Sequence, residues 1–357
     1  MSLVSRMSEP AIEIENVWKI FGAHAWDALA AIKAEGLSKA QVIERFNCVV
    51  AVADANFSVG RGEVFCVMGL SGSGKSTLVR HINRLLDPTD GIIRVNGADV
   101  TTMNPVELRA LRNRQISMVF QNFGLMPHRT VRDNVAMPLE IRGIGKTERW
   151  DEAERALALV SLGGWEDKFA HELSGGMQQR VGLARAIAAN PSILLMDEPF
   201  SALDPLIRRE LQDQFLDLSA QMGKTTIFIT HDLDEAIRLG DRIAIMKDGR
   251  IVQIGSPEHI VARPADDYVA DFVSGISRLS LVFAHTVMVP ADEWQALNGS
   301  IPPCAPRAPH TTDLSGLVDL AVAHRKPILI TDDEGTLIGV VDQIALLRGI
   351  KGNGAAA

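Results

Sequence analysis

The sequence predicts an α/β protein with a mostly parallel sheet, and three observations support this fold class. First, apolar segments at 193–197, 225–230 and 242–246 alternate with helical segments, the order expected of a parallel sheet covered on both faces. Second, the apolar segment VFCVMG leads into a glycine-rich loop and then a helix. Third, residues 11–17 alternate apolar and polar side chains, which is typical of a half-exposed strand.

Short strands and helices are expected along the chain up to residue 190. Residues 22–47 have a helical pattern, and Ser38 is the expected cap before an apolar stripe through Val42 and Phe46. A helix over 75–86 should stop at Asp87-Pro88. The remaining elements expected here are a strand at 49–59, short strands around the Asn-Gly turn of 92–100, a strand at 116–120 and polar-faced helices from 122 to about 190.

The first domain is expected to span residues 1–275. KDGRIVQIG predicts a hairpin, and a helix over 257–275 should close the domain. Residues 276–311 include the proline-rich IPPCAPRAPH and are expected to form a linker or a degenerate repeat.

Residues 312–351 predict a second, small α/β unit. One helix carries Leu314 and Leu317 on one face, strands PILIT and TLIGVV flank the turn DDEG, and a last helix carries Ile344 and Leu347. The tail 352–357 should be disordered.

Composition narrows the range of functions. The chain has 357 residues and a net charge of −8, which argues against a nucleic-acid-binding surface. Three scattered cysteines, Cys48, Cys66 and Cys304, fit a reducing compartment without disulfides, and Cys66 is expected to be buried in a strand. Since no stretch approaches 18 uninterrupted apolar residues and the N-terminus lacks an apolar signal core, we expect a soluble chain whose membrane role comes through partners.

The loop GLSGSGKST matches the phosphate-binding pattern G-x-x-x-x-G-K-[ST] at Gly69, Gly74, Lys75 and Ser76. Its glycines let backbone N–H groups surround phosphates, Lys75 neutralises the β- and γ-phosphate charge, and the Ser76 hydroxyl can ligate Mg²⁺. The predicted phosphate-binding residues are Gly69, Ser71, Gly72, Ser73, Gly74, Lys75, Ser76 and Thr77.

The segment LSGGMQQ at 173–179 predicts a second site for an anion. A serine and two glycines open an amphipathic helix, so a hydroxyl and free backbone N–H groups stand at its positive end. A chain with two such cradles can use both on one nucleotide held between two copies of itself.

Acidic and polar side chains follow several predicted strands. Asp197 and Glu198 end the strand ILLMD, where Asp197 would hold Mg²⁺ and Glu198 would accept a proton from water, although a helix cap is the simpler alternative. Gln121 and His231 stand at equivalent strand exits. Gln121 is assigned to a Mg²⁺ or water contact, and His231 to a γ-phosphate or water contact. A solvated loop position is the alternative for both.

Two further residues complete the predicted site. Asp204 in SALD could act across a dimer interface or could serve a turn. An exposed aromatic is needed to stack on a base, and Phe21 is preferred to Trp18, although either could be a core residue.

The motifs GLSGSGKST, Gln121, LSGGMQQR, ILLMDEP, SALD and His231 occur in an order that resembles the ATP-binding-cassette (ABC) ATPases over about residues 11–275. The resemblance implies a mixed, mostly parallel core sheet, an antiparallel β-subdomain and a helical signature subdomain. It also implies that ATP and Mg²⁺ are bound, with Ser76, Gln121 and Asp197 at the metal and Phe21 on the adenine. Residues assigned to the ATP of the opposing subunit are Ser174, Gly175, Gly176, Met177, Gln178 and Asp204, where Met177 replaces the commoner glutamine.

The insertion 22–47, with GLSKAQVIERF, and motifs such as MVFQNFGLMPHRTV and FSALDPLIRRE resemble the glycine betaine/proline uptake subfamily. This implies an ATPase homodimer on the cytoplasmic face of the cell membrane. Its expected partners are two permease subunits and a periplasmic or lipid-anchored substrate-binding protein, with no nucleic acid. Import of another amine or amino acid is the alternative, and a soluble ABC ATPase acting on nucleic acid or ribosomes is a remote one.

Residues 312–351 resemble half of a cystathionine-β-synthase (CBS) pair. The family's polar residues at the last strand–helix junction are replaced, because GVVDQIA has Asp342 and Ala345 there. The resemblance therefore favours a domain that braces a dimer over one that binds adenosine.

Overall fold

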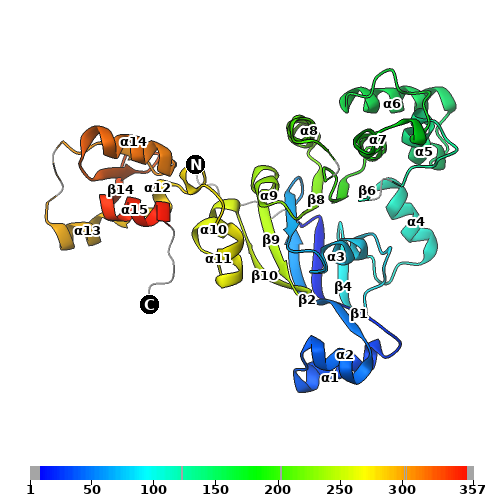
Figure 1. The fold of residues 1–357 in the computed structure, drawn as a ribbon, viewed down its shortest axis with the longest axis horizontal. Helices are drawn as coiled ribbons and strands as arrows, with labels where there is room; N and C mark the ends of the chain where they lie inside the picture. The colour runs from blue at the N-terminus through cyan, green and yellow to red at the C-terminus, as the bar shows by residue number, and fades with distance from the viewer. Residues whose placement is uncertain (1–8, 122–123, 202, 301, 303, 352–357) are drawn as a thin grey trace. The chain divides into compact units, whose positions relative to one another are not determined.

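The computed structural model describes residues 9–121, 124–201, 203–300, 302 and 304–351. These residues form two compact units, one up to Val252 and one from Gln253, and each is described by itself (Figure 1). The predicted tail 352–357 lies outside the described residues. Among the described helices, none combines the length and the apolar character needed to cross a bilayer.

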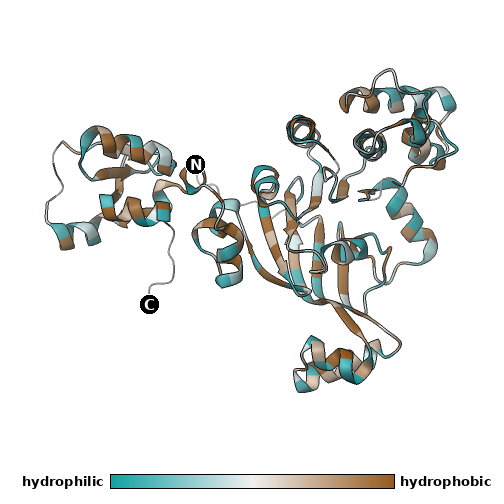
Figure 2. Cartoon of the chain, viewed as in Figure 1, coloured by the Kyte–Doolittle hydropathy of each residue, from teal (hydrophilic) through white to brown (hydrophobic). Residues whose placement is uncertain are grey.

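A six-stranded sheet, in the order β10-β9-β3-β8-β7-β6, forms the centre of the first unit. Strands β3, β6, β7, β8 and β9 pair in parallel. Every residue of β3, β7 and β8 is buried, and much of the central sheet has hydrophobic residues (Figure 2). The predicted α/β fold is confirmed. The strands are β3 (Val64–Met68), β6 (Ile116–Val119), β7 (Ile193–Asp197), β8 (Thr225–Thr230), β9 (Arg242–Lys247) and β10 (Arg250–Gly255).

A second, four-stranded sheet of the first unit has the order β2-β1-β4-β5. Its neighbouring strands are antiparallel, as the resemblance implied. The strands are β1 (Ile12–Phe21), β2 (Val49–Val59), β4 (Asp90–Val95) and β5 (Ala98–Asp99).

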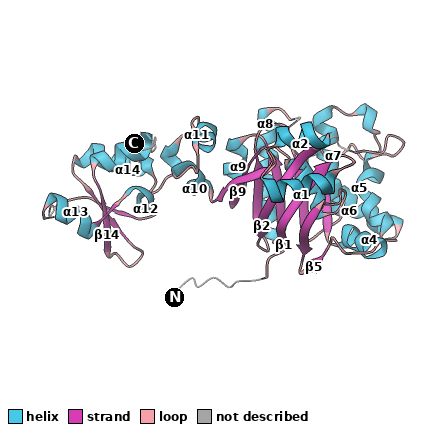
Figure 3. Ribbon diagram, turned by 90° about the horizontal axis from the view of Figure 1, so that it is seen from below, coloured by secondary structure: helices cyan, strands magenta, loops and turns pink. Residues whose placement is uncertain are grey.

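The insertion between β1 and β2 is a pair of short helices, α1 (Ala25–Glu35) and α2 (Lys39–Phe46). Ser38 caps α2 in a complete capping box with Gln41, as predicted. The apolar faces of both helices join a buried cluster with β1 and β2, and Figure 3 shows α1 lying across these strands. The insertion is therefore folded onto the antiparallel sheet.

Helices cover the parallel sheet and form a separate group beside it. Within the predicted helical region 122–190 there are three α-helices, and Figure 1 shows α7 grouped with α5 and α6. The helix expected over 75–86 ends at Ile82, because Arg84 has a left-handed φ of 50°. The helices are α3 (Lys75–Ile82), α4 (Pro105–Arg114), α5 (Val131–Ile141), α6 (Lys146–Leu159), α7 (Gly175–Ala188), α8 (Pro205–Met222) and α9 (Leu233–Leu239).

The prediction of a single helix over 257–275 is wrong. The segment forms α10 (Pro257–Ala262) and α11 (Asp267–Val273). Pro264 disfavours helical backbone at Arg263, and Asp266 caps the next helix by accepting a hydrogen bond from the Val269 N–H at 2.9 Å.

The second unit holds a four-stranded sheet in the order β11-β14-β13-β12. Within 276–311, the segment expected as a linker or a degenerate repeat, the described residues Val289–Pro290 and Arg307–Pro309 form β11 and β12 of this sheet. The elements are α12 (Ala284–Val287), β11 (Val289–Pro290), α13 (Ala291–Asn298), β12 (Arg307–Pro309), α14 (Leu314–His324), β13 (Ile328–Thr331), β14 (Leu337–Val341) and α15 (Gln343–Lys351).

Candidate active site

The glycine-rich loop connects β3 to α3 in a conformation that two of its glycines make possible. Gly69 and Gly74 have φ of +151° and +102°. A Cβ on Gly69 would lie 2.2 Å from the Met246 carbonyl oxygen, and one on Gly74 would lie 2.2 Å from the Ala51 carbonyl oxygen. Side chains at these positions would therefore displace neighbouring backbone, and glycine permits the tight conformation of the loop.

Lys75 is buried inside this loop. Its ammonium donates hydrogen bonds to the carbonyl oxygens of Gly69 (2.7 Å) and Leu70 (3.0 Å). Burial lowers the pKa of Lys75, while the nearby carboxylates of Glu198 and Asp197 raise it. The Lys75 ammonium is thus positioned to donate hydrogen bonds to the anionic oxygens of a phosphate bound at the loop.

Oxygen ligands for a metal ion meet beside Lys75. The Ser76 hydroxyl donates a 2.7 Å hydrogen bond to Asp197, whose side chain is fully buried and also accepts a 3.3 Å bond from Arg80. A hydroxyl and a carboxylate at this separation are hard oxygen donors of the kind that Mg²⁺ prefers. The chemistry of these two residues thus fits the predicted magnesium site.

Glu198 is the point at which the other predicted catalytic residues meet. Its Oε2 lies 3.3 Å from His231 Nδ1 and accepts a 3.3 Å hydrogen bond from Gln121 Nε2. The Glu198 side chain is only 17% exposed, whereas that of His231 is 61% exposed. The Glu198 carboxylate, at the end of β7, is thus joined to side chains from the ends of the two neighbouring strands, β6 and β8.

The backbone of Glu198 is held in an unusual conformation. Its φ is +51°, a region that residues with a side chain seldom adopt. The Glu198 N–H donates to the Ile229 carbonyl oxygen at 3.1 Å, and its own carbonyl accepts a 3.0 Å bond from Gln179. Such constraints concentrate at functional sites. Sequence reasoning did not assign Gln179 or Arg80, although Gln179 is the last residue of LSGGMQQ.

The second predicted anion cradle opens α7. Ser174 is its N-cap and accepts a 3.3 Å hydrogen bond from the Met177 N–H. Ser174 and Gly175 are exposed. Among the described residues, no hydrogen bond joins 174–176 to the phosphate loop. The Gln178 amide N–H groups are used within the chain, where they donate to the carbonyl oxygens of Ala170 (2.9 Å) and Leu173 (3.2 Å).

Phe21 is suited to stack on a base, and its rival Trp18 is not. Phe21 is 42% exposed, whereas Trp18 is 6% exposed and belongs to the buried cluster under the insertion. The Lys19 ammonium lies 5.0 Å from the centre of the Phe21 ring. Lys19 also donates a 2.7 Å hydrogen bond to the Asp87 carbonyl oxygen, beyond α3.

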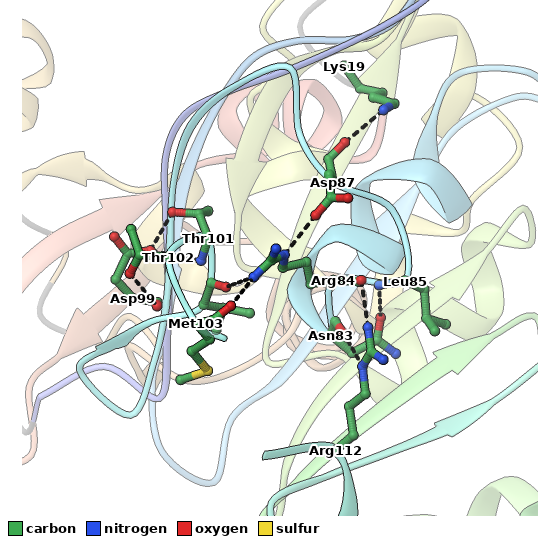
Figure 4. A network of polar contacts seen from close by, with 11 residues as sticks. Lys19, Asn83, Arg84, Leu85, Asp87, Asp99, Thr101, Thr102, Met103 and Arg112 are labelled. Carbon is green, nitrogen blue, oxygen red and sulfur yellow. Dashed lines mark hydrogen bonds and ion pairs between the residues drawn. The ribbon is translucent and has the colours of Figure 1, made fainter. Parts of the chain in front are cut away.

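Figure 4 shows how the segment after α3 is fixed. Arg84 donates to the Asp87 carboxylate (2.7 Å) and to the Met103 carbonyl oxygen (2.6 Å). Arg112, from α4, donates to the carbonyl oxygens of Asn83 (2.8 Å) and Arg84 (2.6 Å). The end of the helix that begins at Lys75 is thereby tied both to β1, which carries Phe21, and to α4.

Asp204 is the N-cap of α8. Its Oδ1 accepts hydrogen bonds from the N–H groups of Leu206 (3.2 Å) and Ile207 (3.1 Å). Asp204 therefore has a local structural role within its own chain. Cys66 is fully buried in β3, as predicted, and burial raises the pKa of its thiol.

The class of protein follows from three features of this site. They are a buried lysine in a glycine-rich loop, an adjacent Ser–Asp pair and a glutamate with a polar partner on either side. Together they are typical of P-loop proteins that hydrolyse nucleoside triphosphates. Residues 52–201 match the family model described as ABC transporter. In solved structures the fold is similar to a dimeric structure of the ATP-binding cassette MJ0796 bound to ADP and Pi, with a TM-score of 0.60 and 30% identity, covering 69% of this chain and 98% of that one.

Curated relatives extend the match. The chain is 53% identical to the glycine betaine/carnitine transport ATP-binding protein GbuA of Listeria monocytogenes, over 78% of this chain and 70% of the relative. It is 52% identical to the glycine betaine/proline betaine transport protein ProV of Escherichia coli, over 76% and 68%. It is 44% identical to the trimethylamine N-oxide transport protein TmoW of Pelagibacter ubique, over 94% and 96%. The chain therefore belongs to the ATP-binding proteins of ABC transporters, as its motifs predicted.

Proposed function

We propose that this chain is the ATP-hydrolysing subunit of an ABC importer that takes up methylated-amine osmolytes such as glycine betaine. The observation that carries the chemistry is the meeting of Gln121 and His231 at the Glu198 carboxylate, at the same strand ends as Asp197. The relatives named for glycine betaine transport support the substrate class.

In the proposed reaction the chain's residues divide the work. Lys75 neutralises phosphate charge, and the backbone N–H groups of residues 69–77 hold the phosphate oxygens. Glu198 accepts the proton of the attacking water, while His231 and Gln121 fix the orientation of its carboxylate. Ser76, Asp197 and Gln121 would hold Mg²⁺, which when bound supplies charge neutralisation at the β- and γ-phosphates.

The proposed active form is a head-to-tail dimer. Ser174 and Gly175 are exposed at the start of α7, and they would meet the γ-phosphate of an ATP bound by the phosphate loop of the opposing copy. Met177 and Asp204 would lie at the same interface. Gln178 would support the cradle from behind, since it is bonded to its own backbone.

The proposed partners are two copies of a membrane permease and a separate substrate-binding protein. The chain would lie on the cytoplasmic face of the membrane, attached through the permease. Closing of the ATPase dimer around ATP would then drive the permease between its two access states.

A specific observation favours trimethylamine N-oxide as a second candidate solute. The glycine betaine relatives align over about three quarters of this chain, whereas the trimethylamine N-oxide relative aligns over 94% of it and 96% of its own length. The second unit of this chain therefore has a counterpart of equal extent in that relative.

Uptake of labelled solutes tests the substrate class. Cells that lack the native subunit are supplied with the chain and its permease and binding protein, and are given labelled glycine betaine, choline or trimethylamine N-oxide. We expect accumulation of at least one of them, and none with Glu198→Gln. Uptake of an unrelated amino acid, with none of the three solutes transported, would contradict the substrate assignment.

We propose that the second unit braces the ATPase dimer. A groove of about 810 Å³ lies between α14 and α15. The apolar side chains of Val322, Ile344 and Leu347 line it and are exposed. Contact with the same groove of a second copy would cover these side chains.

A further inference from the structure

Lys39 is a charged residue to which the mechanism above gives no role. It is the first residue of α2, in the insertion, and follows the N-cap Ser38. Its side chain is half-buried. Among the residues that the structure describes, none accepts a hydrogen bond or forms an ion pair with the Lys39 ammonium. The charges that act on it are those of Asp248 and Arg250.

The Lys39 ammonium lies against Gly249, which is itself hydrogen-bonded to the phosphate loop. A Cβ built on Gly249 would stand 3.3 Å from Lys39 Nζ and 2.7 Å from the Ala51 carbonyl oxygen. The Gly249 N–H donates a 2.9 Å hydrogen bond to the Ser73 carbonyl oxygen, and the Ala51 carbonyl oxygen abuts Gly74. Lys39, Gly249, Ala51 and the loop residues 73–74 are therefore immediate neighbours.

The same neighbours connect Lys39 to Phe21. Phe21 pairs with Val49 on β2, and Ala51 follows two residues further along that strand. The order across the site is thus Phe21, then Ala51 with Lys39, then the loop that surrounds Lys75. In a nucleotide whose base lies on Phe21 and whose β- and γ-phosphates lie at Lys75, the group between these ends is the ribose with its α-phosphate.

We propose that Lys39 binds the ribose and α-phosphate of the nucleotide, so that the insertion helix α2 contributes directly to the nucleotide site. The inference rests on the proposed ATP site. Burial lowers the pKa of Lys39, whereas Asp248 raises it. A half-buried ammonium without a hydrogen-bond acceptor is destabilised, and an anionic ligand would supply that acceptor.

The test is nucleotide binding by the full-length chain. Dissociation constants for ATP and ADP are measured by calorimetry for the wild type, Lys39→Ala, Lys39→Arg, Lys75→Ala and Lys33→Ala. Lys33 is a matched control in the same insertion, because it forms a 2.6 Å ion pair with Asp90. Melting temperatures of the nucleotide-free variants are measured in parallel.

We expect Lys39→Ala to weaken ATP and ADP by the same factor, about tenfold, because both nucleotides carry the α-phosphate. Lys39→Arg should keep affinity within about threefold, since the charge remains. Lys33→Ala should bind like the wild type, and the melting temperature of nucleotide-free Lys39→Ala should not be lower than that of the wild type.

Two outcomes would overturn the Lys39 assignment while leaving the ATP site intact. One is wild-type affinity in Lys39→Ala while Lys75→Ala loses binding. The other is weakened binding that comes with a lower melting temperature and is not rescued by arginine, which indicates a structural role. Failure of the proposed function would look different, because neither the wild type nor Lys33→Ala would then bind ATP.

Discussion

The two predicted anion cradles, residues 69–77 and 174–176, both contain serine and glycine. They differ in how far their polar groups are hydrogen-bonded within the chain. The phosphate loop is closed: Lys75 is buried and bonded to loop carbonyls, and Asp197 is paired with Ser76 and Arg80. The cradle at Ser174 is open: its serine and first glycine are exposed, and its hydroxyl accepts a hydrogen bond from the Met177 N–H of its own helix.

This difference shows which cradle can work within one chain. A site that satisfies its own charges can bind a nucleotide in a single copy. An exposed helix start, without a charged side chain to complete it, offers backbone N–H groups and a hydroxyl to something outside the molecule. Under the proposed function, the nucleotide would therefore bind at the first cradle, and turnover would require both cradles.

The largest expected effect separates binding from turnover at the first cradle. Glu198→Gln should lower ATP hydrolysis by at least about 100-fold, because the amide cannot accept a proton. ATP affinity should be retained, and ATP should trap a dimer detectable by gel filtration. Glu210→Gln, at an exposed position of α8, is the matched control. Rapid repeated turnover by Glu198→Gln would place the base elsewhere.

The next effect tests the second cradle. Ser174→Arg should lower hydrolysis by about 100-fold, because the side chain blocks an exposed phosphate donor. Binding of ATP to the single chain should be unchanged. Ser256 caps α10 in the same way, so Ser256→Arg serves as the control and should hydrolyse normally. Equal activity of the two variants would mean that the open cradle takes no part in turnover.

A smaller effect is expected from the second unit. Ile344→Glu combined with Leu347→Glu should weaken dimerisation by about tenfold, because it places charge on the apolar groove. ATP affinity of the monomer should not change. Leu297→Glu introduces the same charge at an exposed leucine of α13, outside this groove. Sedimentation of all three proteins decides whether the groove is a dimer contact.

The last effect is one on stability rather than on activity, and it concerns the helix that begins in the phosphate loop. His81 in α3 is fully buried, and burial lowers its pKa to about 4. Its neutral form is therefore favoured on folding. Above pH 6.5, His81 should not lower the free energy of unfolding. As the pH drops towards 4, protonation of His81 should lower the free energy of unfolding by at most about 3 kcal/mol.

Urea titrations between pH 7.5 and 4.5 measure this loss. The free energy of unfolding should change less steeply with pH in His81→Gln, because glutamine cannot gain a proton in this range. An identical pH dependence in the two proteins would show that His81 is not the group responsible.

Much of the site could be predicted because its chemistry is local in sequence. The glycine pattern fixed the positions of Lys75 and Ser76, and parallel strands bring Gln121, Glu198 and His231 to one edge. Ser38 and Ser174 were readable as caps, since a cap depends on a few neighbouring residues.

Other features depend on the folded backbone, near or far in sequence. The hydrogen bonds of the Gln178 amide to Ala170 and Leu173 depend on the conformation of the turn before α7. The proximity of Lys39 to Gly249 joins segments about 200 residues apart. The helix break at Pro264 was visible in the sequence but was outweighed by the apolar pattern on either side.

The shared site can be tested most directly by cross-linking two different copies. Cys48 and Cys66 are buried and Cys304 is exposed, so Cys304→Ser and Glu198→Gln provide a suitable background. One preparation carries Ser71→Cys and the other carries Ser174→Cys, and they are mixed with a short thiol-specific cross-linker. We expect a dimer-sized product that requires ATP and both cysteines. Absence of that product, together with an ATP-dependent link within one chain that carries both substitutions, would contradict the account.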